Sequence, residues 1–144
     1  MCNVLFVCPD NAVLGPMAEA CLNRAARGEM RAFSAAAHPA SRLNPSVERL
    51  LRGRGHATAL LQPKSWEIFA LPHAPVPDLL IGLGLRLPLI EPGWSGHPER
   101  RHWRFASADR APSPAEIPAL YQAVKLAVSE FLREENGPPL RRAS

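Results

Sequence analysis

The segment from Val4 to Glu19 constrains the fold more than any other part of the chain. It opens with Val-Leu-Phe-Val, a short apolar run typical of a buried strand. A Cys-Pro-Asp-Asn turn follows, and Gly15-Pro16 then begins a segment with helical spacing of apolar residues. A strand, a tight loop and a helix N-terminus bring loop N–H groups and the positive end of the helix dipole to one point, where an anion can bind. The same field favours a thiolate at Cys8, which makes this residue a candidate nucleophile.

The composition is that of a single globular domain. The chain has 144 residues, of which 47% are hydrophobic and 21% are charged, so it can bury a core. No apolar run approaches the roughly 20 residues that cross a bilayer, and the N-terminus has no signal-peptide pattern. We therefore expect a cytoplasmic protein with no membrane association. The net charge of +4 suits an anionic ligand or partner, and no interleaving of arginine with aromatic residues indicates nucleic acid.

The three cysteines predict neither a disulfide nor a metal site. Cys2 and Cys8 would lie at opposite ends of one strand, roughly 20 Å apart at about 3.3 Å per residue, so they cannot bridge. Cys21 falls inside the first predicted helix and is interpreted as a small core residue. Cysteine and histidine never occur together at the spacing of metal ligands. We therefore expect no metal and no other cofactor.

Strand and helix patterns alternate along the chain. Apolar runs predict strands over 2–7, 31–35, 78–83 and 102–106. Helical spacing predicts helices over 15–27, from 44 to about 53, over 64–69, and from 113 to 136. Asn44 and Ser113 each precede a proline, as N-cap residues often do, and Glu116 completes a capping box with Ser113. The irregular segment 84–101 is a long loop of the kind that borders binding sites.

The loop after the first strand resembles that of a known family. Cys8, Asn11 and the run from Met17 to Ala20 match the pattern Cys-x-x-Asn-x-x-Arg-Ser-x-Met-Ala-Glu-Ala. This pattern is the signature of the low molecular weight protein tyrosine phosphatases and the thioredoxin-coupled arsenate reductases. Further similarities to the arsenate reductases follow in order along nearly the whole chain: Arg31–Ala36 with His38-Pro39, Asn44-Pro45, Lys64-Ser65-Trp66, Ala74-Pro75, Trp94–Pro98 and His102-Trp103.

The resemblance implies a site and also shows what the site lacks. In the family the cysteine attacks phosphate or arsenate, which implies Cys8 as nucleophile and the following loop as the anion-binding loop. That loop consists of Pro9, Asp10, Asn11, Ala12, Val13, Leu14 and Gly15. The family's anion-clamping arginine falls on Leu14, its serine on Gly15, and its glycine before the asparagine on Asp10. Its Asp-Pro general acid falls on Ser107-Ala108, close to Asp109, and its resolving cysteine falls on Gly84.

We expect an α/β three-layer sandwich with a four-stranded parallel sheet in the order 2-1-3-4 and helices on both faces. Residues 1–136 would form one domain, and residues 137–144 a flexible basic tail. Ligands of such sheets bind beyond the carboxyl ends of the strands, where Cys8 would lie. We also expect the first helix to begin within about 8 Å of the Cys8 sulfur, because the connecting loop is short, and Asn11 to brace that loop through side-chain bonds and a left-handed conformation.

Three functions are compatible with these residues. The leading hypothesis is a member of the family that has lost efficient catalysis but keeps the fold and a weak oxyanion or partner site. The second is an active arsenate reductase or phosphotyrosine phosphatase that uses Cys8 with a cation from elsewhere. Arg100, Arg101 and Arg104 are the candidates for that cation. The third is a regulatory module that binds a protein through residues 84–101. Without an arginine, and beside Asp10, the pKa of Cys8 should lie nearer the ordinary thiol value of about 8.5 than the depressed values of primed cysteines.

Overall fold

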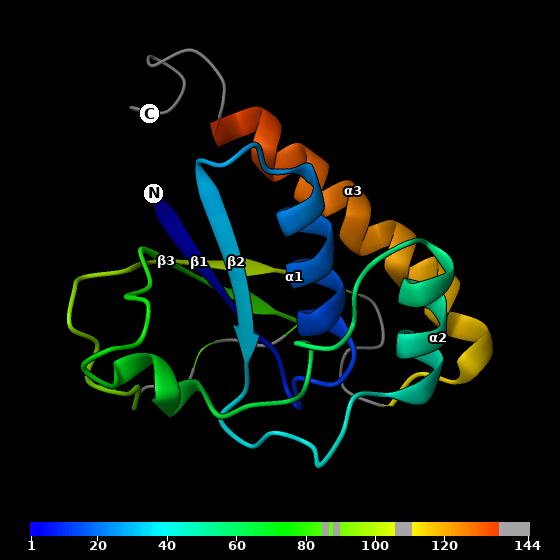
Figure 1. Ribbon diagram of the computed structural model, residues 1–144, viewed down its shortest axis with the longest axis horizontal. Coiled ribbons are helices and arrows are strands. Elements are labelled where there is room, and N and C mark those ends of the chain that lie inside the picture. The colour runs from blue at the N-terminus through cyan, green and yellow to red at the C-terminus, as the bar shows by residue number, and fades with distance from the viewer. Residues whose placement is uncertain (85–86, 88–89, 106–110, 136–144) are drawn as a thin grey trace.

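The structure of the protein is a computed structural model that describes residues 1–84, 87, 90–105 and 111–135. The strands are β1 (Cys2–Val7), β2 (Met30–Ala35), β3 (Leu79–Leu83) and β4 (Glu99–Trp103). The α-helices are α1 (Leu14–Ala25), α2 (Pro45–Gly53) and α3 (Ile117–Glu135), and two short 3-10 helices are η1 (Trp66–Ala70) and η2 (Pro114–Glu116). The strands and helices follow one another along the chain in the order that the sequence predicts (Figure 1).

The four strands form one parallel sheet in the order β2-β1-β3-β4, which confirms the predicted topology. In the register of the central strand, Val4 pairs with Ala32 of β2 and with Leu79 of β3. The edge strand β4 pairs with β3 from Leu79–Glu99 to Leu83–Trp103. Because all four strands run the same way, the loops after β1, β2 and β3 leave from the same edge of the sheet, which is the edge where Cys8 lies.

The sheet is covered on both faces, but by different kinds of helix. Val4 and Phe6 of β1 face a core cluster that includes buried residues of all three α-helices. Leu5 and Val7 face the other side, where they pack with Trp66 of η1 and its neighbours. Figure 1 shows α1, α2 and α3 on one side of the sheet and the short helix η1 apart from them. The predicted three layers are therefore a layer of α-helices, the sheet, and a layer of one 3-10 helix with loops.

Several predicted boundaries differ from the structure. The fourth strand begins at Glu99, three residues earlier than predicted, because hydrogen bonding to β3 sets its extent and an edge strand tolerates charged residues. The segment predicted as a helix over 64–69 is a five-residue 3-10 helix, begun by the Ser65 hydroxyl, which accepts the N–H of Glu67 at 3.2 Å. The first helix ends at Ala25 rather than at residue 27.

The predicted N-caps are confirmed. The Asn44 carboxamide oxygen accepts the backbone N–H groups of Ser46 at 2.9 Å and Val47 at 3.2 Å, so it caps α2. The Glu116 carboxylate accepts the N–H of Ser113 at 3.0 Å in the turn that leads into α3. The predicted boundary near 136 and the tail 137–144 lie outside the described residues. Within the described parts of the chain, no helix has both the length and the apolar character that crossing a membrane requires.

Candidate active site

Cys8 lies at the carboxyl end of β1 and directly against the start of α1. Its sulfur accepts the backbone N–H of Asn11 at 3.2 Å and that of Gly15, in the first turn of α1, at 3.3 Å. The helix therefore begins well within the predicted distance of about 8 Å from the sulfur. Two backbone donors aimed at one sulfur are a geometry that supports a negative charge there.

The Cys8 thiol is nonetheless held neutral by its surroundings. Only 1% of the residue is exposed. Burial raises the pKa of Cys8 to about 11, and the nearby Asp10 carboxylate also raises it, whereas the N–H groups of Gly15, Asn11 and Asp10 act in the opposite direction. The expectation of an undepressed pKa is confirmed, and burial moves the value above that of an ordinary thiol. At neutral pH the residue is a thiol rather than a thiolate.

Asn11 holds the loop in shape, as predicted. It adopts a left-handed backbone conformation with φ of 55°, which asparagine tolerates better than most residues. Its side-chain nitrogen donates to the Ser34 hydroxyl at 2.8 Å, and its side-chain oxygen accepts the backbone N–H of Lys64 at 2.8 Å. The loop is thereby tied to the end of β2 and to the segment before η1, so its shape does not depend on a bound anion.

The Asp10 side chain occupies one of the backbone N–H donors of its own loop. Its carboxylate accepts the N–H of Ala12 at 3.0 Å, and its backbone carbonyl accepts the N–H of Ala40 at 2.8 Å. The carbonyl of Ala12 in turn accepts the N–H of Asn44 at 3.2 Å. The loop is therefore connected to the segment before α2, and its own carboxylate already occupies part of its hydrogen-bonding capacity.

Leu14 is a core residue. It is 6% exposed and belongs to the apolar cluster beneath the three α-helices. Gly15 beside it has no room for a side chain, since a Cβ there would lie 2.9 Å from the Cys8 sulfur and 3.1 Å from the Asn11 amide nitrogen. Leu14, at the position of the family's arginine, therefore packs in the core. Gly15, at the position of its serine, allows α1 to approach Cys8 closely.

Two of the three candidate cations have acidic partners elsewhere. Arg100 binds the Glu91 carboxylate, with its shortest contact at 2.6 Å. Arg101 binds Glu135 at 2.7 Å and lies over the Phe131 ring, with 5.6 Å between the guanidinium carbon and the ring centroid. Arg104 is exposed and makes no hydrogen bond or ion pair with the loop, all of which is described. The alternative in which Arg100 or Arg101 supplies the missing charge therefore finds no support in these contacts.

A buried polar chain behind the loop was not predicted from the sequence. The Ser34 hydroxyl donates to the Glu19 carboxylate at 2.7 Å, and the Lys64 ammonium donates to the Ser34 carbonyl at 3.3 Å. Glu19 is 8% exposed. Burial raises its pKa, while Ser34 and the charge of Lys64 lower it. The sequence could have indicated that Glu19 is buried, because it lies between Ala18 and Ala20 on the apolar side of the first helix. Nothing in the sequence indicated its partners.

The remaining predicted positions divide between described and undescribed residues. Gly84 has a positive φ of 71° and donates its N–H to the Trp103 carbonyl at 2.8 Å. Ser107, Ala108 and Asp109 lie outside the described residues. All three cysteines are free thiols. Among the described residues, no three of the His, Cys, Asp and Glu side chains form a group that could hold a metal ion.

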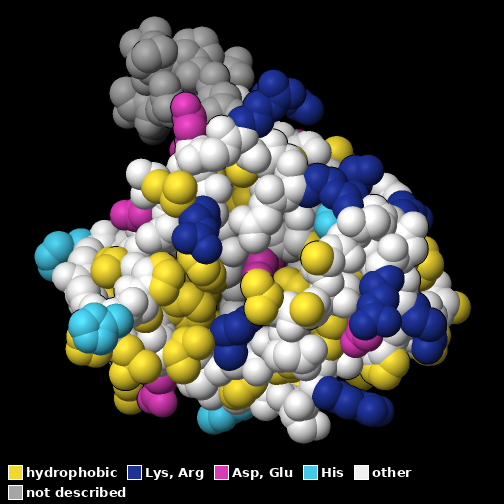
Figure 2. All heavy atoms as spheres, viewed as in Figure 1, with side chains coloured by type: hydrophobic (Ala, Val, Ile, Leu, Met, Phe, Trp, Pro, Cys, Tyr) yellow, Lys and Arg dark blue, Asp and Glu magenta, His cyan; other side chains and the backbone are white. Residues whose placement is uncertain are grey.

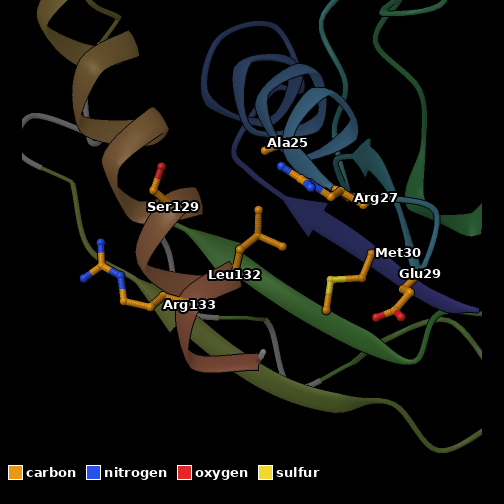
Figure 3. A pocket seen from close by; sticks show the side chains of 8 residues that line it. Ala25, Arg27, Glu29, Met30, Ser129, Leu132 and Arg133 are labelled. Carbon is orange, nitrogen blue, oxygen red and sulfur yellow. The ribbon is translucent and has the colours of Figure 1, made fainter. Parts of the chain in front are cut away.

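A cavity of about 600 Å³ lies away from Cys8 (Figure 3). It is lined by Ala25, Ala26, Arg27, Glu29, Met30, Ser129, Leu132 and Arg133. In Figure 3 the side chains of Arg27 and Arg133 lie on opposite sides of it. Met30 begins β2, so this cavity is at the amino ends of the strands, opposite the edge where ligands of open α/β sheets bind. The candidate active site therefore remains the loop after Cys8.

A parallel α/β sheet with a cysteine loop between its first strand and first helix defines the class of protein. Residues 3–83 match the family model described as low molecular weight phosphotyrosine protein phosphatase. The chain belongs to this family. No curated protein matches the sequence.

Similar solved structures agree with this assignment. An arsenate reductase in the phosphate-binding state is 22% identical, with a TM-score of 0.72 over 91% of this chain and 96% of that one. A thioredoxin-dependent arsenate reductase from Corynebacterium glutamicum is 24% identical, with a TM-score of 0.69 over 92% of this chain, which spans only 61% of that protein. An arsenate reductase from Archaeoglobus fulgidus DSM 4304 is 27% identical, with a TM-score of 0.57 over 88% of this chain and 98% of that one.

Proposed function

We propose that this protein is a member of the family that has lost efficient phosphatase and arsenate reductase catalysis and keeps a weak oxyanion site at the Cys8 loop. The observation that carries the proposal is the buried position of Leu14 where the family has its anion-clamping arginine. Phosphoryl transfer depends mainly on positioning and charge stabilisation. A site that has no arginine and keeps its cysteine protonated lacks both the clamp and the nucleophile.

The expected loss of rate is large. Removing one oxyanion donor costs on the order of 100- to 1000-fold in rate, and removing a general acid costs about 100-fold or more. Ser107-Ala108 stands at the position of the Asp-Pro acid, so both losses apply. Their product is a loss of turnover on the order of 10,000-fold or more relative to an intact site. The free cysteines are in keeping with the reducing environment of the cytoplasm, where we place the protein.

The test is turnover of a small aryl phosphate, and of arsenate with thioredoxin, by the wild-type protein and by Cys8→Ser. The proposal predicts equal rates for the two proteins, because Cys8 contributes no turnover. A wild-type rate that exceeds the Cys8→Ser rate by 100-fold or more would overturn it.

An active enzyme is the second candidate, supported by the two backbone N–H groups on the Cys8 sulfur and by the phosphate-binding state of a structural neighbour. In that case a candidate cation is Lys64, whose backbone N–H is bonded to the Asn11 side chain and whose ammonium lies 3.3 Å from the Ser34 carbonyl. Turnover that is lost in both Cys8→Ser and Lys64→Met would favour this candidate.

A regulatory protein-binding module is the third candidate. Its support is Ile90, a large apolar side chain that lies on the segment before β4 and is 87% exposed. Pull-down of one specific protein by the wild type, but not by Ile90→Ser, would favour it over the other two.

A further inference from the structure

Three buried polar side chains meet where α1, the end of α2 and α3 come together. Cys21, His56 and Tyr121 are 5%, 8% and 2% exposed. The His56 Nε2 atom and the Tyr121 hydroxyl are hydrogen-bonded at 2.9 Å, and the Cys21 thiol lies against the same hydroxyl. This cluster, the His56–Tyr121 cluster, lies beside the second half of α1, where Cys21 is about 9 Å along the helix from Gly15 at roughly 1.5 Å per residue.

Three basic side chains surround the cluster. Arg24 and Lys125 line the same small cavity as His56 and Tyr121. The Arg54 guanidinium lies over the Tyr121 ring at 5.2 Å from its centroid. Within the described parts of the chain, none of these three cations forms an ion pair. Among the described residues, these three cations therefore have no carboxylate partner.

The charges of these cations shift the pKa values of the side chains between them. The pKa of His56 is lowered first by burial and then by the charges of Arg24 and Lys125. Arg24 and Arg54 also lower the pKa of Tyr121, which burial and Cys21 raise. Figure 2 shows Lys and Arg side chains over α2 and along α3, with few acidic side chains among them. An anion placed at the cluster would therefore meet a positive potential.

The cavity has the size of one small anion. Its volume is about 100 Å³, well above the roughly 10–15 Å³ that a single water molecule needs. Its polar lining comes from Cys21, Arg24, His56, Tyr121, Lys125 and Ser129. Guanidinium, ammonium and hydroxyl groups are donors suited to the several oxygens of one phosphate group. Arg24 reaches its place because the turn at Gly55, with φ of 83°, has no side chain; a Cβ there would lie 3.3 Å from the Arg24 guanidinium.

A groove continues from the cavity along α1. Its volume is about 570 Å³, and it shares Arg24 and His56 with the small cavity. Ala57, Ala59, Leu60 and Leu61 line it, and Leu60 is 85% exposed. Glu19 and Ala20 of α1 also line it, and the Glu19 carboxylate is bonded to the Ser34 hydroxyl. Asn23 also lines it, and both its amide nitrogen and its amide oxygen are bonded to the backbone of Ala32. The groove therefore suits the organic part of a ligand whose anionic end occupies the small cavity.

We propose that the His56–Tyr121 cluster and its cations bind the phosphate group of a small phosphate monoester, whose organic part lies in the groove beside Leu60. The site is a binding site separate from the Cys8 loop and does not rest on the function proposed for that loop. Arg24 and Lys125 supply the charge, Tyr121 and Ser129 supply hydroxyl groups, and Leu60 supplies apolar contact.

The experiment is an NMR titration of the Cys8→Ser protein with phenyl phosphate and with inorganic phosphate, so that no hydrolysis at Cys8 interferes. We expect saturable shifts of the His56 ring and of the amides near Arg24 and Lys125, with tighter binding of phenyl phosphate. Shifts confined to residues 11–15, or no saturable shift with either compound, would overturn the proposal. Equal affinities for the two compounds would refute the role of the groove.

Matched variants test the cations. Arg24→Met and Lys125→Met should each weaken phenyl phosphate binding by about tenfold to 100-fold, the effect of one charge-assisted hydrogen bond. Arg49→Met is the control, because Arg49 is an exposed arginine on α2 that does not line the cavity and its loss changes the net charge equally. All three side chains replaced are exposed, and the amide spectrum reports that each variant is folded. If Arg24→Met binds as tightly as Arg49→Met, the proposal is wrong.

Discussion

The protonation of Cys8 gives a sharp prediction about reactivity. Burial raises the pKa of Cys8 to about 11. At pH 7 only about one molecule in 10,000 then carries a thiolate, compared with about 3% for an ordinary thiol of pKa about 8.5. Since the thiolate is the reacting form, this difference alone slows alkylation by roughly 300-fold. The 1% exposure of the residue slows it further, because the reagent must wait for the loop to open.

The assay is alkylation by iodoacetamide between pH 5 and pH 10, followed for the Cys8 peptide by mass spectrometry. The denatured chain is the reference, and its Cys8 should react with a midpoint near the ordinary value of about 8.5. In the native protein we expect a rate at pH 7 at least about 300-fold below that of the denatured chain and no plateau below about pH 8.5.

Asp10→Asn is the matched variant, since it removes the neighbouring charge and leaves the burial that dominates the shift. It should lower the pKa of Cys8 without bringing it below the ordinary value. A native midpoint below about pH 6.5 would refute the reasoning, because it would show that the N–H groups of Asn11 and Gly15 outweigh burial.

Three further predictions concern the surroundings of the loop. Leu14→Ala should destabilise the protein by about 2–5 kcal/mol and Leu14→Met by less than about 1.5 kcal/mol in urea unfolding, because Leu14 is a core side chain; equal midpoints for Leu14→Ala and wild type would contradict its place in the core. Asn11→Ala should cost about 1–3 kcal/mol, since two hydrogen bonds are lost and alanine is strained at φ of 55°; a change below that range would mean that the bonds do not hold the loop. Burial raises the pKa of the Glu19 carboxyl, so the folded protein binds the carboxyl proton more tightly than the unfolded chain does. The stability of the protein should therefore fall as pH rises from the unfolded towards the folded pKa of Glu19. Glu19→Gln keeps an oxygen that accepts the Ser34 hydroxyl and should flatten the pH dependence of stability. If the variant and the wild type show the same pH dependence, Glu19 is not its source.

The local features of the fold could be predicted from the sequence because their signals are local. The Asn44-Pro45 pair marks a helix start through one side chain and its next three residues, and the structure confirms it. The apolar run of β1 and the left-handed Asn11 are likewise properties of a few adjacent residues. Alternation of strands and helices, together with the family resemblance, was sufficient for the sheet order.

The unpredicted features depend on residues far apart in the chain. The extent of β4 follows from its hydrogen bonds to β3, about twenty residues earlier, and the sequence around Glu99 carries no strand pattern of its own. The chain of Asn11, Ser34 and Glu19 joins a loop, a strand and a helix, so no single window contains it. Leu14 was interpreted only as a missing arginine, and its contribution to the core became visible when the three α-helices were placed around it.

The central claim is that the loop keeps its shape but binds an oxyanion only weakly, because Leu14 stands at the place of the arginine. The most direct test is an NMR titration of wild type and Leu14→Arg with inorganic phosphate, read at the amides of residues 11–15, which are separate from the His56–Tyr121 cluster. An arginine that reaches the loop adds charge-assisted bonds of about 1.5–3 kcal/mol each, so phosphate should bind the loop of Leu14→Arg about tenfold to a few hundredfold more tightly than the wild-type loop. Equal affinity of the two loops, with both proteins folded, would contradict the claim.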